Sequence, residues 1–297
     1  MATRLVPKIT IKSLVDYIEK ISRYAATNRK LKCYRGQQSD KWGAIPSLFR
    51  PDMIELERNE KRAIRDLMSV HPNEFSDDRT MLDRLVRMQH FGLPTRLMDV
   101  SLNPLIALYF ATEDSDEHNS TNGRVVALSI PEEREKYYDS DSVAAIANLA
   151  NMTSGEKDAI RKLRGSTAIK IPSKVQRKRL NDNLTIQRLH QFIREEKPHF
   201  LPIIRPVDLF KPYYVHPRMT NRRILAQSGA FIIYGLTPTK AINFRNKIEE
   251  TFFVIPHALK QGIQASLDLL GINESTVYPE LDRAAKRIKN SYLKATP

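Results

Sequence analysis

Two short runs of the sequence combine residue types that could bind an anionic ligand and act on it. The first is Tyr34-Arg35-Gly36, and the second, from Gln89 to Asp99, is Gln-His-Phe-Gly-Leu-Pro-Thr-Arg-Leu-Met-Asp. Each places polar side chains beside glycine at predicted strand ends or turns, where such groups stay accessible on a rigid frame. A structural salt bridge in a loop would explain either run alone. Together, and followed by a buried helix, they predict a shared ligand site.

Arg35 follows a predicted strand over residues 31–34, so its guanidinium is expected to lie over a cleft. Arginine grips a phosphate or carboxylate with two parallel, charge-assisted hydrogen bonds. Gly36 is expected to let the ligand approach the backbone. The second run is expected to be irregular, with Gln89, His90, Thr95, Arg96 and Asp99 close to the free amides of a helix that starts at Asn103-Pro104.

Other common site chemistries have no support in the sequence. The seven histidines are scattered, and no second ligand follows His90 at helical spacing, so no metal site is expected. Glycine-rich nucleotide loops and the serine-hydrolase elbow are missing. The single Cys33 lies in an apolar-alternating run and is expected to be a buried, inert thiol.

Composition predicts one globular domain. The chain has 297 residues, of which 41% are hydrophobic, which is enough for a sizeable core. No apolar run is long enough to cross a membrane, and the first residues lack the order of a signal peptide. A cytoplasmic protein without a membrane partner is therefore expected.

The net charge of +14 is unevenly distributed. Residues 161–179 contain eight basic residues and no acidic one, which suits a polyanion such as nucleic acid. A solubilising loop and a surface for an acidic inhibitor protein are the alternatives. The nucleic-acid contacts predicted here are Arg161, Lys162, Arg164, Lys174, Arg177, Lys178 and Arg179.

Hydrophobic periodicity predicts strands separated by long helical stretches. This pattern favours an α+β domain with a mixed central sheet surrounded by helices. Helices are expected at 11–28, 51–71, 79–90, 103–111, 142–197 (with a break at 165–172), 257–270 and 279–293. Strands are expected at 31–34, 124–130, 230–234 and 251–255.

Five motifs, in this order, resemble the FRG domain family. They are Tyr-Arg-Gly (34–36) with Pro-Ser-Leu-Phe-Arg (46–50), the run 89–99, Asn-Pro-Leu-Ile-Ala-Leu-Tyr-Phe-Ala (103–111), Arg-Ile-Leu-Ala-Gln-Ser-Gly-Ala-Phe (223–231) and Leu-Gly-Ile-Asn-Glu-Ser-Thr-Val-Tyr-Pro-Glu-Leu-Asp (270–282). The resemblance implies one FRG-type domain over residues 1–297. Its core is expected at about 30–134 and 200–290, with a helical basic insertion at about 135–200 and helices at the C-terminus.

The order of these motifs also resembles the layout of the ADP-ribosyltransferase fold, which implies NAD as a substrate. By position, Arg35 with Tyr34 and Gly36 would anchor NAD. Thr95, Arg96, Asp99 and Ser101 would form the middle motif that orients the nicotinamide end, and Gln89 would be a further contact to NAD.

The resemblance leaves the catalytic acid open. A late glutamate would stabilise the oxocarbenium-like ribose of the transition state. Glu250 has the better chemistry for that role, while Gln227 matches the family motif better. His90 or Asp99 could instead supply the acid-base function.

These inferences lead to a hypothesis of an NAD-dependent ADP-ribosyltransferase that modifies single-stranded nucleic acid, since a base edge must be exposed to react. Such an enzyme would be a toxin or anti-phage effector restrained by an inhibitory protein such as an antitoxin. The alternatives are a non-enzymatic nucleic-acid-binding module, and a nuclease or NAD glycohydrolase that uses the same cleft.

Overall fold

The computed structural model describes residues 6–113, 118, 120–166, 178, 181–219, 221–236 and 248–279. The helix predicted at 279–293 lies outside the described residues. The same holds for the side chain of Arg164 and for Lys170, Lys174, Arg177 and Arg179 of the basic stretch.

Within the described residues, eight strands form one mixed sheet. They are β1 (Lys8–Thr10), β2 (Leu31–Gln37), β3 (Leu97–Ser101), β4 (Gly123–Ile130), β5 (Glu135–Tyr137), β6 (Tyr213–His216), β7 (Gly229–Ile233) and β8 (Glu249–Ile255). Their order is β1-β8-β4-β2-β3-β7-β6-β5. The outer pairs β1–β8 and β5–β6 are parallel and the other pairs are antiparallel. The predicted α+β class with a single mixed sheet is therefore confirmed.

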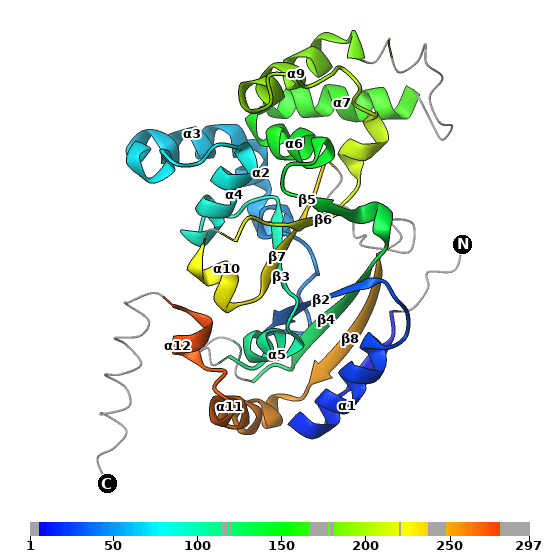
Figure 1. The fold of residues 1–297 in the computed structure, drawn as a ribbon, viewed down its shortest axis with the longest axis vertical. Coiled ribbons are helices and arrows are strands. Elements are labelled where there is room, and N and C mark those ends of the chain that lie inside the picture. The colour runs from blue at the N-terminus through cyan, green and yellow to red at the C-terminus, as the bar shows by residue number, and fades with distance from the viewer. Residues whose placement is uncertain are drawn as a thin grey trace.

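The helices pack around this sheet (Figure 1). They are α1 (Leu14–Ala25), α2 (Ile54–Arg58), α3 (Glu60–Val70), α4 (Met81–His90), α5 (Pro104–Thr112), α6 (Asp141–Ala147), α7 (Ser154–Ser166), α9 (Leu184–Glu196), α10 (Arg222–Ala226), α11 (Lys260–Leu269) and α12 (Glu274–Val277). The helix predicted at 51–71 is divided, because residues 51–53 form a 3-10 turn and Asn59 separates α2 from α3.

Local chemistry fixes the two helices that flank the second motif. At the start of α4, Thr80 and Asp83 form a capping box, and beyond its end Gly92 has a φ of 90°, which favours glycine. At the start of α5, the Asn103 side chain accepts a hydrogen bond from the Leu105 amide and Pro104 occupies the first turn. These caps set where the polar residues between the helices begin and end.

The irregular structure expected before α5 is wrong, since residues 97–101 form strand β3. Every residue of β3 pairs with β7, from Leu97 opposite Ile233 to Ser101 opposite Gly229. This strand is only five residues long, too short for its pattern to stand out in the sequence, and pairing with a distant segment overrides the weak local preference. Strand β2 is also longer than predicted, so Arg35 lies within it, opposite Val126.

One face of the sheet is covered by two separate groups of helices. Tyr34 pairs with Ser101, so Leu97, Asp99 and Ser101 point to the same face as Tyr34. Helices α1, α5 and α11 pack on β2, β4 and β8 at this face, while α4 packs against β3 and α6 against β7, with α7 and α9 beyond α6 (Figure 1). The opposite face holds a third core that joins the two halves of the sheet and includes Cys33.

The two halves of the sheet meet at a weak junction. Strands β2 and β3 are paired only at Tyr34 and Ser101, whereas β2 pairs with β4 along its whole length. The sheet therefore opens where the two groups of helices also separate. In the described part of the chain, no helix is both long and apolar enough to span a bilayer.

Candidate functional site

A cleft with a volume of about 260 Å³ lies at the junction of β2 and β3. Most of the predicted catalytic and NAD-binding residues line it, although they come from three different elements, β2, α4 and β3, and from the turn before β7. They are Tyr34, Arg35, Gly36, Gln89, His90, Asp99, Ser101 and Gln227. The sequence motifs thus converge on one site.

Arg35 connects the two halves of the sheet across this cleft. Its Nη1 donates a hydrogen bond of 2.8 Å to the carbonyl oxygen of Asp99 on β3. Its Nε is buried and has no hydrogen-bond partner among the described residues. Burial lowers the pKa of this guanidinium and the nearby Asp99 carboxylate opposes the change, so arginine stays charged at neutral pH. A cation with an unused donor at a cleft suits an anionic ligand.

Gly36 serves a different purpose from the one expected. A Cβ atom at this position would lie 2.0 Å from the Ala107 carbonyl oxygen and 2.6 Å from the Cβ of Phe110. The missing side chain therefore lets α5 pack directly on β2. Gly36 lines the cleft, but the lack of a side chain at this position makes room for helix α5 and not for a ligand.

Ser101 and the turn before β7 hold Gln227 in place. The Ser101 hydroxyl donates to the Gln227 carbonyl oxygen at 2.7 Å, and the Leu102 amide donates to the Ser228 carbonyl oxygen at 2.9 Å. Ser228 has a φ of 45°, which is strained for a residue with a side chain. The Gln227 amide nitrogen donates to the Val277 carbonyl oxygen at 3.1 Å. Ser101 is therefore a positioning residue for Gln227.

Among the described residues, two carboxylates line the cleft, Asp99 and Glu113. Asp99 is exposed on β3 beside Arg35. Glu113, at the end of α5, accepts a hydrogen bond of 3.0 Å from the Tyr278 hydroxyl. Asp99 is consequently the carboxylate that a ligand can reach more directly. His90, in the last turn of α4, adds the imidazole of the site.

Sequence reasoning missed a further group of cleft residues. Trp42 is the single tryptophan of the chain and lies in the turn after β2. The Arg50 guanidinium lies over its ring, 5.2 Å from the ring centroid. An isolated tryptophan among turn residues was the available signal. Phe110 and Arg223 belong to the 103–111 and 223–231 motifs but were given no role in the site, and the others, which had no distinctive pattern, are Gln37, Gln38, Glu113 and Asn221.

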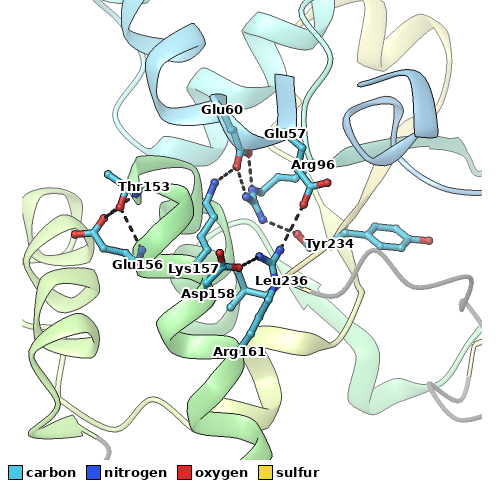
Figure 2. Close-up of polar contacts among 10 residues, drawn as sticks. All are labelled: Glu57, Glu60, Arg96, Thr153, Glu156, Lys157, Asp158, Arg161, Tyr234 and Leu236. Carbon is cyan, nitrogen blue, oxygen red and sulfur yellow. Dashed lines mark hydrogen bonds and ion pairs between the residues drawn. The ribbon is translucent and has the colours of Figure 1, made fainter. Parts of the chain in front are cut away.

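Thr95 and Arg96 do not line the cleft, which corrects their predicted contact with NAD. Both are buried, and the Thr95 hydroxyl donates to Gln89. Arg96 Nε donates to Glu60 at 2.9 Å and its Nη1 to the Tyr234 carbonyl oxygen at 3.0 Å (Figure 2). Lys157 Nζ, from α7, also contacts Glu60 at 2.5 Å. Arg96 is thus paired with the buried Glu60 carboxylate, because an unpaired charge at this position would strongly destabilise the folded state.

Arg161 was predicted to contact nucleic acid as a basic residue without acidic partners, but its side chain pairs with two acidic residues of the protein. It contacts Asp158 at 2.7 Å and Glu57 at 3.4 Å, and its Nε donates to the Leu236 carbonyl oxygen at 3.2 Å (Figure 2). These contacts fasten α7 to α2 and to the segment after β7. Lys162 and Lys178 are exposed and remain available to a polyanion.

Glu250 is not among the residues that line the cleft, and we therefore assign it no catalytic role. It lies on β8, opposite Leu128, two strands away from the junction. Burial raises the pKa of its carboxyl to about 7, and the charge of Arg124 offsets part of that rise. A glutamate suits the catalytic role by its chemistry, but the position of Glu250 in the fold keeps it out of the cleft.

This burial makes a prediction about pH. Because the folded-state pKa of Glu250 is near 7 and its ordinary value is 4.5, the folded state holds a proton that the unfolded state releases between these values. Glu250 therefore lowers stability as pH rises through this window, by on the order of 2 kcal/mol. The free energy of unfolding, measured in urea, should fall less between pH 5 and pH 8 for Glu250→Gln than for the wild type.

The matched control is Glu249→Gln, since Glu249 is exposed and its ion pair with Lys30, at 3.3 Å, lies at the surface. This variant should keep the wild-type dependence on pH. Glu196, whose pKa burial also raises to about 7, acts in the same direction, so Glu250→Gln reduces the slope without removing it. An unchanged slope in Glu250→Gln would show that its carboxyl is solvated.

The described ranges contain no cluster of three or more His, Cys, Asp or Glu that could hold a metal ion.

Comparison with known proteins gives one result. Residues 30–120 match the protein-family model described as the FRG domain. This range includes the Tyr34–Gly36, Gln89–Asp99 and Asn103–Ala111 motifs. No curated protein and no solved structure matches the chain.

Proposed function

Because residues 30–120 carry an FRG domain, and because this domain supplies most of the cleft, we propose that the chain is an NAD-dependent ADP-ribosyltransferase that modifies single-stranded nucleic acid. One observation carries the proposal. Arg35, with a buried Nε that lacks a partner among the described residues, lies at the opening of the sheet beside Asp99, and Gln227 and His90 line the same cleft.

Each group has a role that its chemistry suits. Arg35 binds the diphosphate of NAD, and the half-buried rings of Trp42 and Phe110 offer faces for its aromatic rings. Gln227 has its amide nitrogen committed to Val277, so its amide oxygen is the group that orients a ribose hydroxyl. These contacts fix the donor at the junction of β2 and β3.

The transfer step balances without any other reactant. The bond between ribose C1 and the nicotinamide nitrogen breaks, and its electron pair leaves with nicotinamide. Asp99 stabilises the positive charge that develops on the ribose. A nitrogen or oxygen of the acceptor base forms the new bond to C1, and its proton passes to His90 as the general base.

The acceptor class follows from charge and from the need for an accessible base. A net charge of +14 favours a polyanionic partner, and a base within a duplex would not reach the cleft. The proposal includes action in the cytoplasm as a toxin or anti-phage effector, under the control of an inhibitory protein. This biological setting rests on analogy with similarly destructive enzymes.

The test is to incubate the protein with NAD and short single-stranded RNA or DNA and to measure NAD consumption and oligonucleotide mass. Transfer adds one ADP-ribose unit to the oligonucleotide. Loss of NAD without an adduct would instead indicate a glycohydrolase, and strand cleavage without NAD would indicate a nuclease. Oligonucleotide binding with no affinity for NAD would leave a non-enzymatic binding module.

Asp99→Asn should lower turnover by roughly 10²-fold or more, because the amide cannot offer a negative charge to the transition state. Affinity for NAD, measured by calorimetry, should change little, since this contact matters mainly as the bond breaks. Glu250→Gln is the control, as a carboxylate outside the cleft, and should keep its turnover. A fully active Asp99→Asn beside an inactive Glu250→Gln would return the catalytic role to Glu250.

A further inference from the structure

A second groove, with a volume of about 600 Å³, continues from the cleft between α4 and α10. Five residues line both hollows, namely Val86, His90, Asn221, Arg223 and Ile224. We call this second hollow the α4–α10 groove. A molecule that lies in it can therefore reach the cleft past His90.

The α10 side of the groove is basic. Arg218, Arg222 and Arg223 all line it. Arg222 is exposed, while Arg218 lies over the Tyr138 ring at 4.6 Å and Arg223 over the Tyr278 ring at 5.1 Å. Stacking on aromatic rings holds these two guanidinium planes in fixed positions without neutralising their charge.

The α4 side carries three aspartates, but two of them are already engaged. Asp78 accepts two hydrogen bonds of 2.8 Å from Arg87. The Asp83 carboxylate accepts from the Thr80 amide at 3.0 Å as part of the helix cap. Among the described residues that line the groove, four arginines (Arg87, Arg218, Arg222 and Arg223) stand against three aspartates (Asp77, Asp78 and Asp83), so the groove has an excess of positive charge.

An exposed aromatic ring stands where the groove meets the cleft. Phe91 lines the groove and is 59% exposed, and its ring contacts the His90 ring edge-to-face at a centroid distance of 5.2 Å. Gly92, directly after it, ends α4 and holds Phe91 at the tip of the helix. A large apolar ring left in solvent beside cations is typical of sites on which nucleic-acid bases stack.

We propose that the α4–α10 groove binds the single-stranded acceptor. Its phosphates lie along Arg222 and the neighbouring arginines, one base stacks on Phe91, and the base to be modified enters the cleft past His90. The inference rests on the proposed function and assigns the acceptor site that it needs. An acidic peptide would use the same arginines but has no need of the Phe91 ring, so the ring favours nucleic acid.

The test measures the affinity of a labelled single strand of about ten nucleotides, by fluorescence anisotropy in the absence of NAD. Phe91→Ala should weaken binding by roughly fivefold or more, since stacking of one base contributes about 1–3 kcal/mol. Arg222→Glu should also weaken binding by roughly fivefold or more, because it reverses the charge that faces the phosphates. Arg222→Gln should also lower the salt dependence by about one unit of slope. The control Arg23→Glu reverses a charge that is 80% exposed on α1 and should have little effect.

The outcomes separate this inference from the proposed function. If both groove variants bind the strand as the wild type does, or if Arg23→Glu weakens binding equally, the groove is not the acceptor site, whatever the NAD measurements show. If polyglutamate displaces the strand and Phe91→Ala has no effect, the groove binds an acidic protein and the inference is overturned. Weakened strand binding in a protein that does not bind NAD would support the groove and refute the transferase.

Discussion

Replacement of Arg35 by alanine is expected to reduce NAD affinity by on the order of 100-fold, because two charge-assisted hydrogen bonds to the diphosphate are lost. Turnover at subsaturating NAD should fall at least as much. Arg35→Lys should restore little of this, since an ammonium cannot form the paired bonds of the guanidinium. Calorimetry with NAD and an assay of NAD consumption measure both effects.

Arg35 also bonds to the Asp99 carbonyl oxygen across the junction of the sheet, so stability must be measured beside affinity. Lys41→Ala is the matched control, because Lys41 is exposed, lies close in sequence and does not line the cleft. A folded Arg35→Ala variant that binds NAD as well as the wild type would contradict the assignment of the donor site. A collapse in Tm would show that Arg35 mainly joins the two halves of the sheet.

Glu60→Gln is expected to destabilise the protein by about 3–5 kcal/mol, because Arg96 and Lys157 would be left as buried cations without their shared carboxylate. Their side chains and that of Glu60 are no more than 5% exposed. Burial alone would raise the pKa of Glu60, but the charges of both cations and their hydrogen bonds hold it below its ordinary value. The loss of stability should lower the Tm by roughly 10 °C.

Glu55→Gln provides the control for this variant. Glu55 lies on α2, is 77% exposed and contacts Arg58 at 2.6 Å, so its replacement should cost less than about 1 kcal/mol. Chemical unfolding followed by circular dichroism measures both variants. A Glu60→Gln protein that keeps its Tm but loses NAD affinity would instead return Arg96 to the ligand site.

The sequence by itself determined the class of fold and several of the residues that line the site. Helix α5 could be predicted because its cap and its uninterrupted apolar residues are local features. Strand β4 (Gly123–Ile130) was equally clear from its apolar run. Arg35, His90 and Asp99 could be selected because polar side chains and glycines directly beside apolar segments are unusual, whatever fold the chain adopts.

Tertiary structure alone decided which of these residues serve the cleft. Arg96 directly precedes β3 and Asp99 lies on it three residues later, yet Arg96 is buried against Glu60 and Asp99 is exposed beside Arg35. Glu250 has suitable chemistry, but its place on β8 keeps it out of the cleft. Such differences depend on partners that are distant in sequence, such as Glu60 and Lys157 for Arg96. The free energy of a charged side chain is set by the charges that the fold brings to it, and no local pattern contains that information.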